Sequence, residues 1–275
     1  SALLTDLYEL TMMQGYFLKE RNPRVVFDMF FRTHPFNSGF SIFAGLENML
    51  KALEDFEFSE DDIEYLSSLN LFHDRFLDFL RDFKFTGDIY SMSEGSVIFP
   101  GEPLLRVHSR LIQAQMIESM LLNTLNFQSL VATKAARIYH ASEGGKVLEF
   151  GLRRAQGWDG ALSATRAAYI GGALATSNTL GGKKYGIPVS GTMAHSWVMA
   201  FRNELESFEK FAQLYPDKAI LLIDTYDTLG SGIENAIKVG KKLKEQGKKL
   251  GVRLDSGDLS YLRQKVRKGL DAAGL

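Results

Sequence analysis

Apolar residues recur at two different spacings in the first part of the chain. Over residues 4–19 they recur three or four positions apart, which predicts an amphipathic helix; the positions are Leu7, Leu10, Met13 and Phe17. Over Val25–Phe31 β-branched and aromatic residues follow one another, which predicts a strand. The two spacings indicate a mixed domain in which helix and strand alternate.

Turn and cap residues divide the rest of this part. Ser59 stands before Glu60-Asp61-Asp62, so we expect it to be the N-cap of a helix, with Asp62 three residues on. Gly and Pro turns then separate three short apolar runs, which predict strands; these are Phe85–Tyr90, Ser96–Phe99 and Leu104–Val107.

After residue 110 apolar runs of strand length alternate with helical patterns. Such alternation is typical of βα units and a parallel sheet. The predicted helices are Leu111–His140, with a break near Asn126, then Gly160–Ala175, Ser196–Leu214, Gly232–Gln246 and Asp258–Ala273. The predicted strands between them are Val147–Phe150, Ile187–Val189, Ala219–Ile223 and Lys249–Leu254.

The predicted fold class is α/β, in two domains. Residues 1–110 form an α+β domain, and residues 111–275 hold four or five strand–helix units of a parallel sheet. A closed barrel of eight such units usually takes about 250 residues, so these units make roughly half a barrel. Either the sheet is open or the chain stops early, and the ending just past a helix favours the second interpretation.

Composition excludes several classes of protein. Of 275 residues 45% are apolar and 24% charged, which is typical of a globular protein rather than a disordered one. The net charge of −1 gives no basic field for nucleic acid. Cysteine is absent, so disulfides and thiol chemistry are excluded. No stretch predicts a membrane span or a signal peptide, and we expect a cytoplasmic protein.

Polar residues of the second half gather directly after the apolar strands. Glu149, Arg153 and Arg154 follow one strand, and His195 follows the next. Asp224 and the Arg253–Asp258 segment follow the last two. Because the carboxyl ends of parallel strands share one rim, we expect these side chains to converge there. Ser256 and Asp258 have a simpler alternative, as N-caps of the following helix.

The residue types indicate an anionic substrate. Arginines bind carboxylate or phosphate oxygens through paired hydrogen bonds, and aspartates hold magnesium or ribose hydroxyls. The glycine pairs 171–172 and 181–182 match no phosphate-loop fingerprint. A metal-dependent hydrolase is the rival, but the chain has only five histidines and no close pair. We therefore expect an enzyme acting on a phosphorylated substrate.

Four motifs after the strands closely resemble the nicotinate phosphoribosyltransferase family. They are Glu149-Phe150-Gly151-Leu152-Arg153-Arg154-Ala155-Gln156-Gly157, Gly191-Thr192-Met193-Ala194-His195-Ser196, Asp224-Thr225-Tyr226-Asp227-Thr228 and Gly251-Val252-Arg253-Leu254-Asp255-Ser256-Gly257-Asp258-Leu259. Two segments near the start, Leu4–Met12 and Phe43–Glu47, also resemble the family. The resemblance covers nearly the whole chain, with the motifs in family order.

The resemblance implies a reaction and a fold. Nicotinate and phosphoribosyl pyrophosphate would give nicotinate mononucleotide and pyrophosphate, with ATP and Mg²⁺ as co-substrates and coupling through a phosphohistidine. The family fold is an N-terminal α/β sandwich beside an irregular parallel α/β barrel, of which this chain would hold only part. The family's glycine-rich loop for the ribose 5′-phosphate would lie beyond Leu275. The resemblance also implies a homodimer with shared active sites, no nucleic-acid partner and no membrane partner.

The resemblance assigns roles position by position. His195 would be the histidine that ATP phosphorylates, oriented by Asp224 or Glu149, and the sequence does not choose between these carboxylates. Asp255 would hold ribose hydroxyls or their magnesium. The other implied substrate-binding residues are Phe150 and the partner subunit's Tyr8 on the two faces of the pyridine ring, Thr192 and Arg253 at nicotinate, Arg153 and Arg154 at anionic oxygens, Asn178 and Ser256.

Three alternatives remain open. Nicotinamide phosphoribosyltransferase has a similar architecture, but it carries an Asp where this chain has Asn178, and an Asp would repel the nicotinate carboxylate. Quinolinate phosphoribosyltransferase lacks the ATP-coupled histidine. The last alternative is an inactive, truncated module that serves only in dimerisation.

Overall fold

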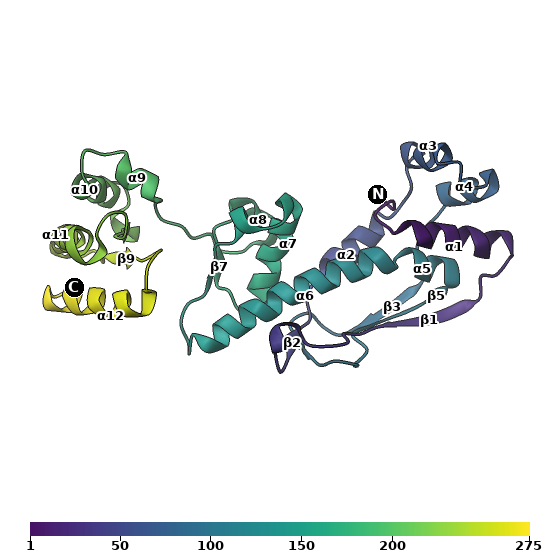
Figure 1. Cartoon of the computed structure of the whole chain (residues 1–275), viewed down its shortest axis with the longest axis horizontal. Helices are drawn as coiled ribbons and strands as arrows, with labels where there is room; N and C mark the ends of the chain where they lie inside the picture. Colours follow the sequence, from purple (N-terminus) through teal and green to yellow (C-terminus); the bar gives the residue numbers. More distant parts are fainter. The chain divides into compact units, whose positions relative to one another are not determined.

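The computed structural model describes residues 1–275, and its chain contacts divide into two compact units, Ser1–Ser190 and Gly191–Leu275 (Figure 1). The expected domain boundary at residue 110 falls inside the first unit. Chain contacts do not separate there, because the helix that follows packs back on the strands and on the first helix. A boundary between domains at residue 110 therefore stays a prediction.

An antiparallel sheet of order β1-β5-β3 begins the first unit; its strands are β1 (Arg24–Met29), β5 (Leu105–Arg110) and β3 (Asp88–Ser91). Along β5, alternate residues are buried, as expected for a sheet with one face on a core. Helices α1 (Leu7–Leu18) and α5 (Leu111–Met116) pack together, and α5 also packs on β1 and β5 (Figure 1). The predicted first helix and these three strands are confirmed, with ends shifted by a few residues.

Three helices complete this part: α2 (Leu46–Glu54), α3 (Glu60–Ser68) and α4 (Asp74–Arg81). The predicted N-cap of α3 is confirmed as a capping box. The Ser59 hydroxyl accepts from Asp62 N at 3.2 Å, and the Asp62 carboxylate accepts from Ser59 N at 2.9 Å. Phenylalanines from α1, from α4 and from the segments that flank α3 and α4 pack together in the core of this part. A short 3₁₀ turn, Pro35–Asn37, precedes a two-stranded pair, β2 (Ser41–Ile42) with β4 (Val97–Ile98).

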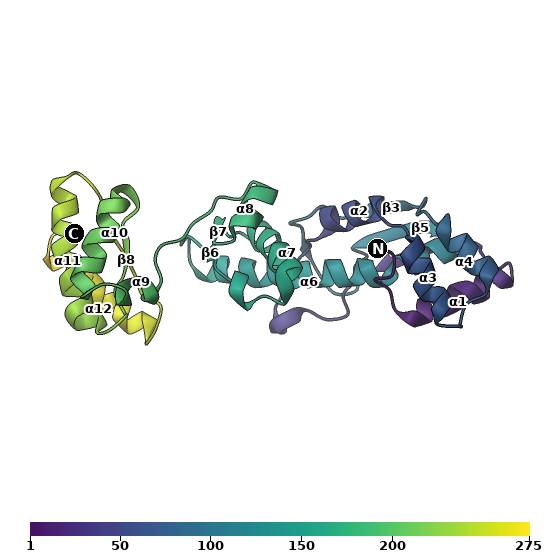
Figure 2. The same cartoon turned by 90° about the horizontal axis from the view of Figure 1, so that it is seen from above.

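The long predicted helix is two helices, and its break lies at Ile117 rather than near Asn126. Helix α6 (Glu118–Ala141) runs unbroken past Asn126, which is exposed and costs the helix little. Its buried hydroxyls reach the neighbouring chain: Ser129 Oγ accepts from Ala44 N at 3.1 Å, and Thr133 Oγ1 accepts from Ile42 N at 2.9 Å. Helix α6 thereby joins β2 to α7 (Gly157–Ile170), which packs along it (Figures 1 and 2).

Two glycines end α7 five residues before the predicted end. At Gly171 a Cβ would lie 2.3 Å from the Ala132 carbonyl oxygen, and Gly172 has φ +105°. The predicted helix over 171–175 is therefore wrong. The chain turns instead into β7 (Ala175–Thr176), which pairs in parallel with β6 (Leu148–Glu149), and then into α8 (Thr179–Tyr185). Val189 pairs with β7 through a single parallel bridge. The strand predicted over 187–189 is therefore reduced to this one bridge.

The second unit contains one parallel pair, β8 (Ile220–Leu222) with β9 (Gly251–Arg253), and four helices. The helices are α9 (His195–Met199), α10 (Glu204–Leu214), α11 (Ile233–Glu245) and α12 (Leu259–Ala272); two short turns, Pro216–Lys218 and Thr228–Gly232, flank β8. The single helix predicted over 196–214 is wrong, because Asn203 starts a new one and accepts from Glu206 N at 2.9 Å.

The parallel pairs followed by helices confirm the predicted α/β class. Buried Leu221, Leu222 and Ile223 lie in the core of the second unit among apolar residues of α10, α11 and α12. No helix in the structure combines the length and the apolar composition needed to cross a membrane.

Candidate active site

The carboxyl ends of β8 and β9 bring the predicted aspartates of the second unit together. Leu222 lies opposite Arg253 in the parallel register, so the residues after both strands emerge at the same edge. Asp224 Oδ2 accepts from the backbone N–H of Asp255 at 2.6 Å and from the Ser256 hydroxyl at 2.7 Å. One carboxylate thus fixes the start of the loop that follows β9.

His195 lies at the first position of α9, between a hydroxyl and a carboxylate. Its Nδ1 is 3.1 Å from Thr225 Oγ1, and its Nε2 is 3.6 Å from Asp255 Oδ2. Arg253 Nη2 donates to the other oxygen of Asp255 at 2.9 Å. The side chains of His195 and Asp255 are about a third exposed, at 37% and 35%. The ring is therefore held from both sides and still open to a ligand.

Within the second unit the carboxylate that faces His195 is Asp255 rather than the expected Asp224, and the alternative with Glu149 of the first unit stays a prediction. Asp224 is engaged by Asp255 N and by Ser256, so it acts on the loop rather than on the imidazole. Glu149 is engaged by groups of its own unit. Thr225 was not among the predicted residues. Its position directly after Asp224, at a strand end, was the available signal.

The two aspartates fit a hydrated magnesium ion. Asp224 Oδ1 is buried and has no hydrogen-bond partner, which is costly unless a donor or cation completes it. Mg²⁺ usually takes one or two carboxylates together with waters and substrate phosphates. The structure contains no group of three or more His, Asp or Glu arranged to hold a metal. Asp224 Oδ1 is therefore the atom of this pair with unused capacity to bind a cation.

In the first unit the predicted residues lie around the ends of β6 and β7. Glu149 Oε2 accepts from Thr176 Oγ1 at 2.6 Å and from Thr165 Oγ1 at 3.2 Å, and Oε1 accepts from the backbone N–H of Gly151. The chain then forms a 3₁₀ turn, Leu152–Arg154. Phe150 before the turn is half-buried, whereas the side chains of Arg153 and Arg154 in it are exposed.

Asn178 is buried, with 3% of its surface exposed, and acts as the N-cap of α8. Its Oδ1 accepts from Gly181 N at 3.1 Å, and its Nδ2 donates to Thr165 Oγ1 at 3.1 Å. Asp258 is likewise a cap, accepting from Tyr261 N at 3.0 Å, whereas Ser256 is not. Thr192 is half-buried, and its hydroxyl donates to the Met193 carbonyl at 3.4 Å.

Tyr8 presents its ring to solvent from α1, with 51% of its surface exposed. The neighbouring Glu9 carboxylate, followed by desolvation and the charge of other nearby acidic residues, raises the pKa of Tyr8 to about 12. The phenol is therefore protonated at physiological pH. An exposed, neutral aromatic ring at a helix start can stack on a planar ligand or a partner.

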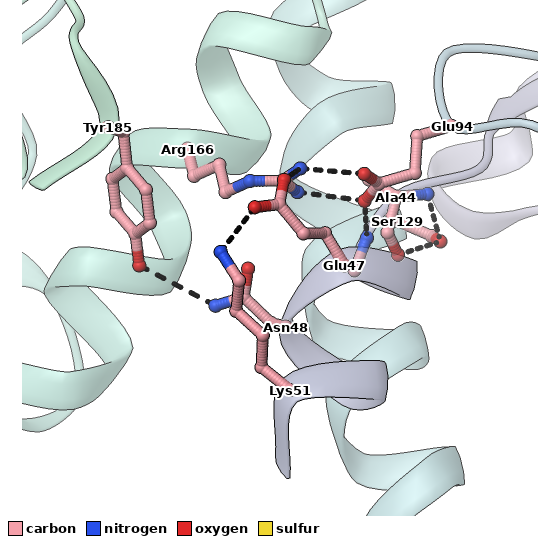
Figure 3. Close-up of polar contacts among 9 residues, drawn as sticks. Ala44, Glu47, Asn48, Lys51, Glu94, Ser129, Arg166 and Tyr185 are labelled. Atoms are coloured by element: carbon pink, nitrogen blue, oxygen red, sulfur yellow. Dashed lines mark hydrogen bonds and ion pairs between the residues drawn. The ribbon is translucent and has the colours of Figure 1, made fainter. Parts of the chain in front are cut away.

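A charged cluster of the first unit lies outside the predicted residues (Figure 3). Arg166 of α7 binds Glu94, in the turn before β4, and Glu47 of α2 at 2.5 Å. Glu94 Oε1 also accepts from Gly45 N at 2.6 Å, and Glu47 pairs with Lys51. Sequence reasoning missed this cluster because its members are far apart along the chain and follow no motif.

Comparison with known families gives two matches. Residues 3–126 match the N-terminal domain model of nicotinate phosphoribosyltransferase, and residues 145–269 match the model of the nicotinate phosphoribosyltransferase family. The two matches follow one another and account for most of the chain.

Curated relatives carry the same description. The chain is 46% identical over 274 residues to a nicotinate phosphoribosyltransferase of Mycobacterium tuberculosis, covering 100% of this chain and 59% of the relative. It is 47% identical over 274 residues to that of Bacillus subtilis, covering 99% and 56%. The chain thus spans under two thirds of the length of these relatives.

Solved structures share the fold. Human nicotinic acid phosphoribosyltransferase superposes with a TM-score of 0.88 at 34% identity, covering 98% of this chain and 64% of that one. A nicotinate-nucleotide pyrophosphorylase from Pyrococcus furiosus superposes with a TM-score of 0.80 at 24% identity, covering 99% and 63%. The second likeness supports the fold alone.

Proposed function

Because the chain belongs to the nicotinate phosphoribosyltransferase family, we propose that the protein containing it makes nicotinate mononucleotide for NAD biosynthesis. The pyridine nitrogen of nicotinate attacks C1 of phosphoribosyl pyrophosphate. The C1–oxygen bond breaks, and pyrophosphate leaves with the bonding electrons. The observation that carries the proposal is 46–47% identity to curated enzymes of this name along the whole chain.

His195 is the residue we assign to ATP coupling. A neutral imidazole is a competent nucleophile near pH 7 when its neighbours orient it. Its attack on the γ-phosphorus of ATP forms an N–P bond and releases ADP. Thr225 fixes the ring through Nδ1, and the Asp255 carboxylate, 3.6 Å from Nε2, stabilises the positive charge that develops on the ring.

Asp255 and Asp224 are the residues we assign to magnesium and ribose. When bound, Mg²⁺ neutralises phosphate oxygens and makes pyrophosphate a better leaving group. Asp224 holds the Asp255 backbone and, with Ser256, sets the loop from which the Asp255 carboxylate extends. Arg253 donates to Asp255 at 2.9 Å, which places the guanidinium group beside that carboxylate, where it can bind an anionic oxygen of the substrate.

Residues of the first unit supply recognition of the planar, anionic substrate. Phe150 provides an aromatic face for the pyridine ring, and Arg153 and Arg154 provide cations for carboxylate or diphosphate oxygens. Asn178 carries no charge that would repel a carboxylate, which favours nicotinate over nicotinamide. In the second unit, Thr192 is the hydroxyl expected near nicotinate.

We propose a homodimer in the cytoplasm, with Tyr8 of one copy stacking on the pyridine ring bound by the other. The exposed, protonated Tyr8 ring supports this role. Light scattering of the full-length protein measures the oligomeric state. A monomer that retains full activity would contradict the shared site, since it has no second copy to supply Tyr8.

A substrate comparison tests the proposed function. The full-length protein is given phosphoribosyl pyrophosphate, ATP and Mg²⁺ with equal concentrations of nicotinate, nicotinamide or quinolinate. We expect nicotinate mononucleotide to form fastest from nicotinate. Faster consumption of nicotinamide, release of carbon dioxide from quinolinate, or no turnover of any pyridine would each overturn the proposal, the last in favour of a dimerisation module.

A further inference from the structure

The carboxylate of Glu149 accepts hydrogen bonds from three parts of the first unit. Thr176 Oγ1 of β7 lies 2.6 Å and Thr165 Oγ1 of α7 lies 3.2 Å from Oε2, and Gly151 N donates to Oε1. Thr165 and Thr176 are buried, with 1% of their surface exposed. A carboxylate can accept about four hydrogen bonds, so three neutral donors satisfy most of its capacity.

A second set of bonds extends this network to the next helix. Thr176 Oγ1 accepts from Asn178 N at 2.9 Å, and Thr165 Oγ1 accepts from Asn178 Nδ2 at 3.1 Å. Both hydroxyls near Glu149 therefore also accept a hydrogen bond from Asn178. These bonds hold the Thr176 hydroxyl in one orientation, whereas the Thr165 hydroxyl also lies 2.9 Å from the Ala161 carbonyl and has only one proton for the two acceptors.

The approach of this carboxylate to Gly151 leaves little room for a side chain there. A Cβ on Gly151 would lie 2.8 Å from Glu149 Oε1, closer than real Cβ atoms come to an oxygen. The φ of Gly151 is −88°, so its backbone conformation does not itself require glycine. A Cβ at this position would have to displace the Glu149 carboxylate, which folds back over the main chain at Gly151.

The contact between Glu149 and Gly151 determines the path of the following segment, which carries the side chains that we assign to substrate recognition. Phe150 lies between the two residues that Glu149 joins, and the turn with Arg153 and Arg154 starts directly after Gly151. Arg154 N donates to the Gly151 carbonyl at 2.8 Å, and Arg154 Nη1 donates to the Phe150 carbonyl at 3.4 Å. The backbone positions of Arg153 and Arg154 therefore follow from the direction in which the chain leaves Gly151, and the Arg154 side chain is held in addition by the Phe150 carbonyl.

We propose that Glu149 is a positioning residue for the Phe150–Arg154 segment, acting with Thr165, Thr176 and Asn178 to fix the groups that bind the anionic pyridine and diphosphate. It neither contacts the substrate nor orients His195. The proposal deepens the proposed function and rests on it. Glu149 gives affinity and orientation, because a substrate then finds its aromatic face and cations already in place.

Steady-state kinetics of the full-length protein test the proposal. Glu149→Gln keeps the side chain's shape but replaces one acceptor oxygen with an NH₂ group against these donors. We expect KM for nicotinate or phosphoribosyl pyrophosphate to rise about tenfold and kcat to change less than threefold. Thr176→Val should give the same split, and Thr176→Ser, which keeps the hydroxyl, should restore the wild-type KM. Glu54→Gln, an exposed carboxylate at the end of α2, is the matched control.

Phosphorylation of His195 by ATP separates the proposal from its rivals. We expect it to be unchanged in Glu149→Gln. Loss of the phosphohistidine with an unchanged KM would assign Glu149 to His195 and overturn the proposal. A lowered Tm with unchanged KM in both variants would make the role purely structural and also overturn it.

Binding of inorganic pyrophosphate, measured by calorimetry, keeps the proposal testable if the wild-type protein turns over no pyridine. In that case the proposed function fails, while about tenfold weaker pyrophosphate binding by Glu149→Gln would still support positioning of Arg153 and Arg154. Equal binding by the wild type and Glu149→Gln would overturn the positioning role.

Discussion

Arg166 and Glu94 form a bidentate ion pair between α7 and the turn before β4, with Nη1–Oε1 at 2.8 Å and Nη2–Oε2 at 2.6 Å (Figure 3). Both side chains are largely buried, at 12% and 18% exposed. Because Glu94 also accepts from Gly45 N, the pair joins α7 to the start of α2 as well. This contact ties the antiparallel part of the first unit to the part that carries Glu149 and Phe150.

Removal of the guanidinium group should destabilise the protein. Arg166→Met keeps much of the apolar stem but leaves Glu94 unpaired in a poorly solvated place, and we expect a loss of about 2–3 kcal/mol in the free energy of unfolding. Urea denaturation measures it. Lys51→Met removes an exposed pair with Glu47 and should cost under about 0.5 kcal/mol. Equal effects of the two substitutions would contradict this account.

Acid should weaken the same contact. Burial acts to raise the pKa of Glu94, but hydrogen bonds from Arg166 and Gly45 N and the charge of Arg166 outweigh it, so the pKa is lowered overall. A carboxylate with a lowered pKa stabilises the fold above its unfolded pKa and loses that contribution as the pH falls through its folded pKa. The Tm gap between wild type and Glu94→Gln should therefore be full at pH 7 and shrink below about pH 4.3. A gap that widens on acidification would be inconsistent with the pairing.

Local signals in the sequence predicted the elements whose ends are set by local bonds. Ser59 and Asp62 predicted the start of α3, and Asp258 the cap of α12. The split between α9 and α10 had a similar signal in Asn203, which the continuous helical pattern over 196–214 obscured. The end of α7 depends on the approach of Gly171 to the Ala132 carbonyl, a contact across 39 residues that no local pattern contains.

Loss of the α3 cap should be a small and local effect. Ser59→Ala removes the acceptor for Asp62 N, and caps of this type contribute about 1 kcal/mol. Thermal unfolding should show a Tm lowered by a few degrees. Ser59→Asp, which keeps an acceptor at the cap, should recover most of the loss; a Tm as low as that of Ser59→Ala would contradict the capping role.

The strand-end rule predicted one shared rim for all four strands, and within the second unit it predicted which residues gather but not how they pair. Asp224, Asp255 and Ser256 come together because β8 and β9 are parallel and in register. The pairing depends on the turn after β9, which directs the Asp255 N–H toward Asp224 and its carboxylate toward His195. Side-chain direction in a short loop follows from packing, which residue spacing does not record.

Asp224 should affect catalysis indirectly, through the position of Asp255. Asp224→Ala leaves Asp255 N and the Ser256 hydroxyl without their shared acceptor, and we expect kcat/KM to fall at least a hundredfold. Ser256→Ala removes only one of the two bonds and should cost less than tenfold. Steady-state assays of nicotinate mononucleotide formation measure both. A larger loss for Ser256→Ala than for Asp224→Ala would contradict this hierarchy.

Substitutions of Arg253 and of His195 should affect different half-reactions, phosphoribosyl transfer and ATP hydrolysis respectively. Arg253→Ala removes a charge-assisted contact of about 2–5 kcal/mol at a desolvated site, so transfer should fall while basal ATP hydrolysis largely persists. His195→Ala should abolish ATP hydrolysis but leave some phosphoribosyl transfer, with weaker apparent affinity for nicotinate. Parallel assays of ADP and nicotinate mononucleotide measure both. Identical profiles for the two variants would contradict separate roles.

The assignment of ATP coupling to His195 depends on phosphoryl transfer from ATP to its ring. The full-length protein is incubated with ATP labelled in its γ-phosphate and Mg²⁺, and the labelled residue is then mapped by mass spectrometry under alkaline conditions that preserve N–P bonds. We expect one acid-labile phosphoryl group, on His195 and absent from His195→Ala. A label on His34, His73, His108 or His140, or full ATP hydrolysis by His195→Ala, would contradict it.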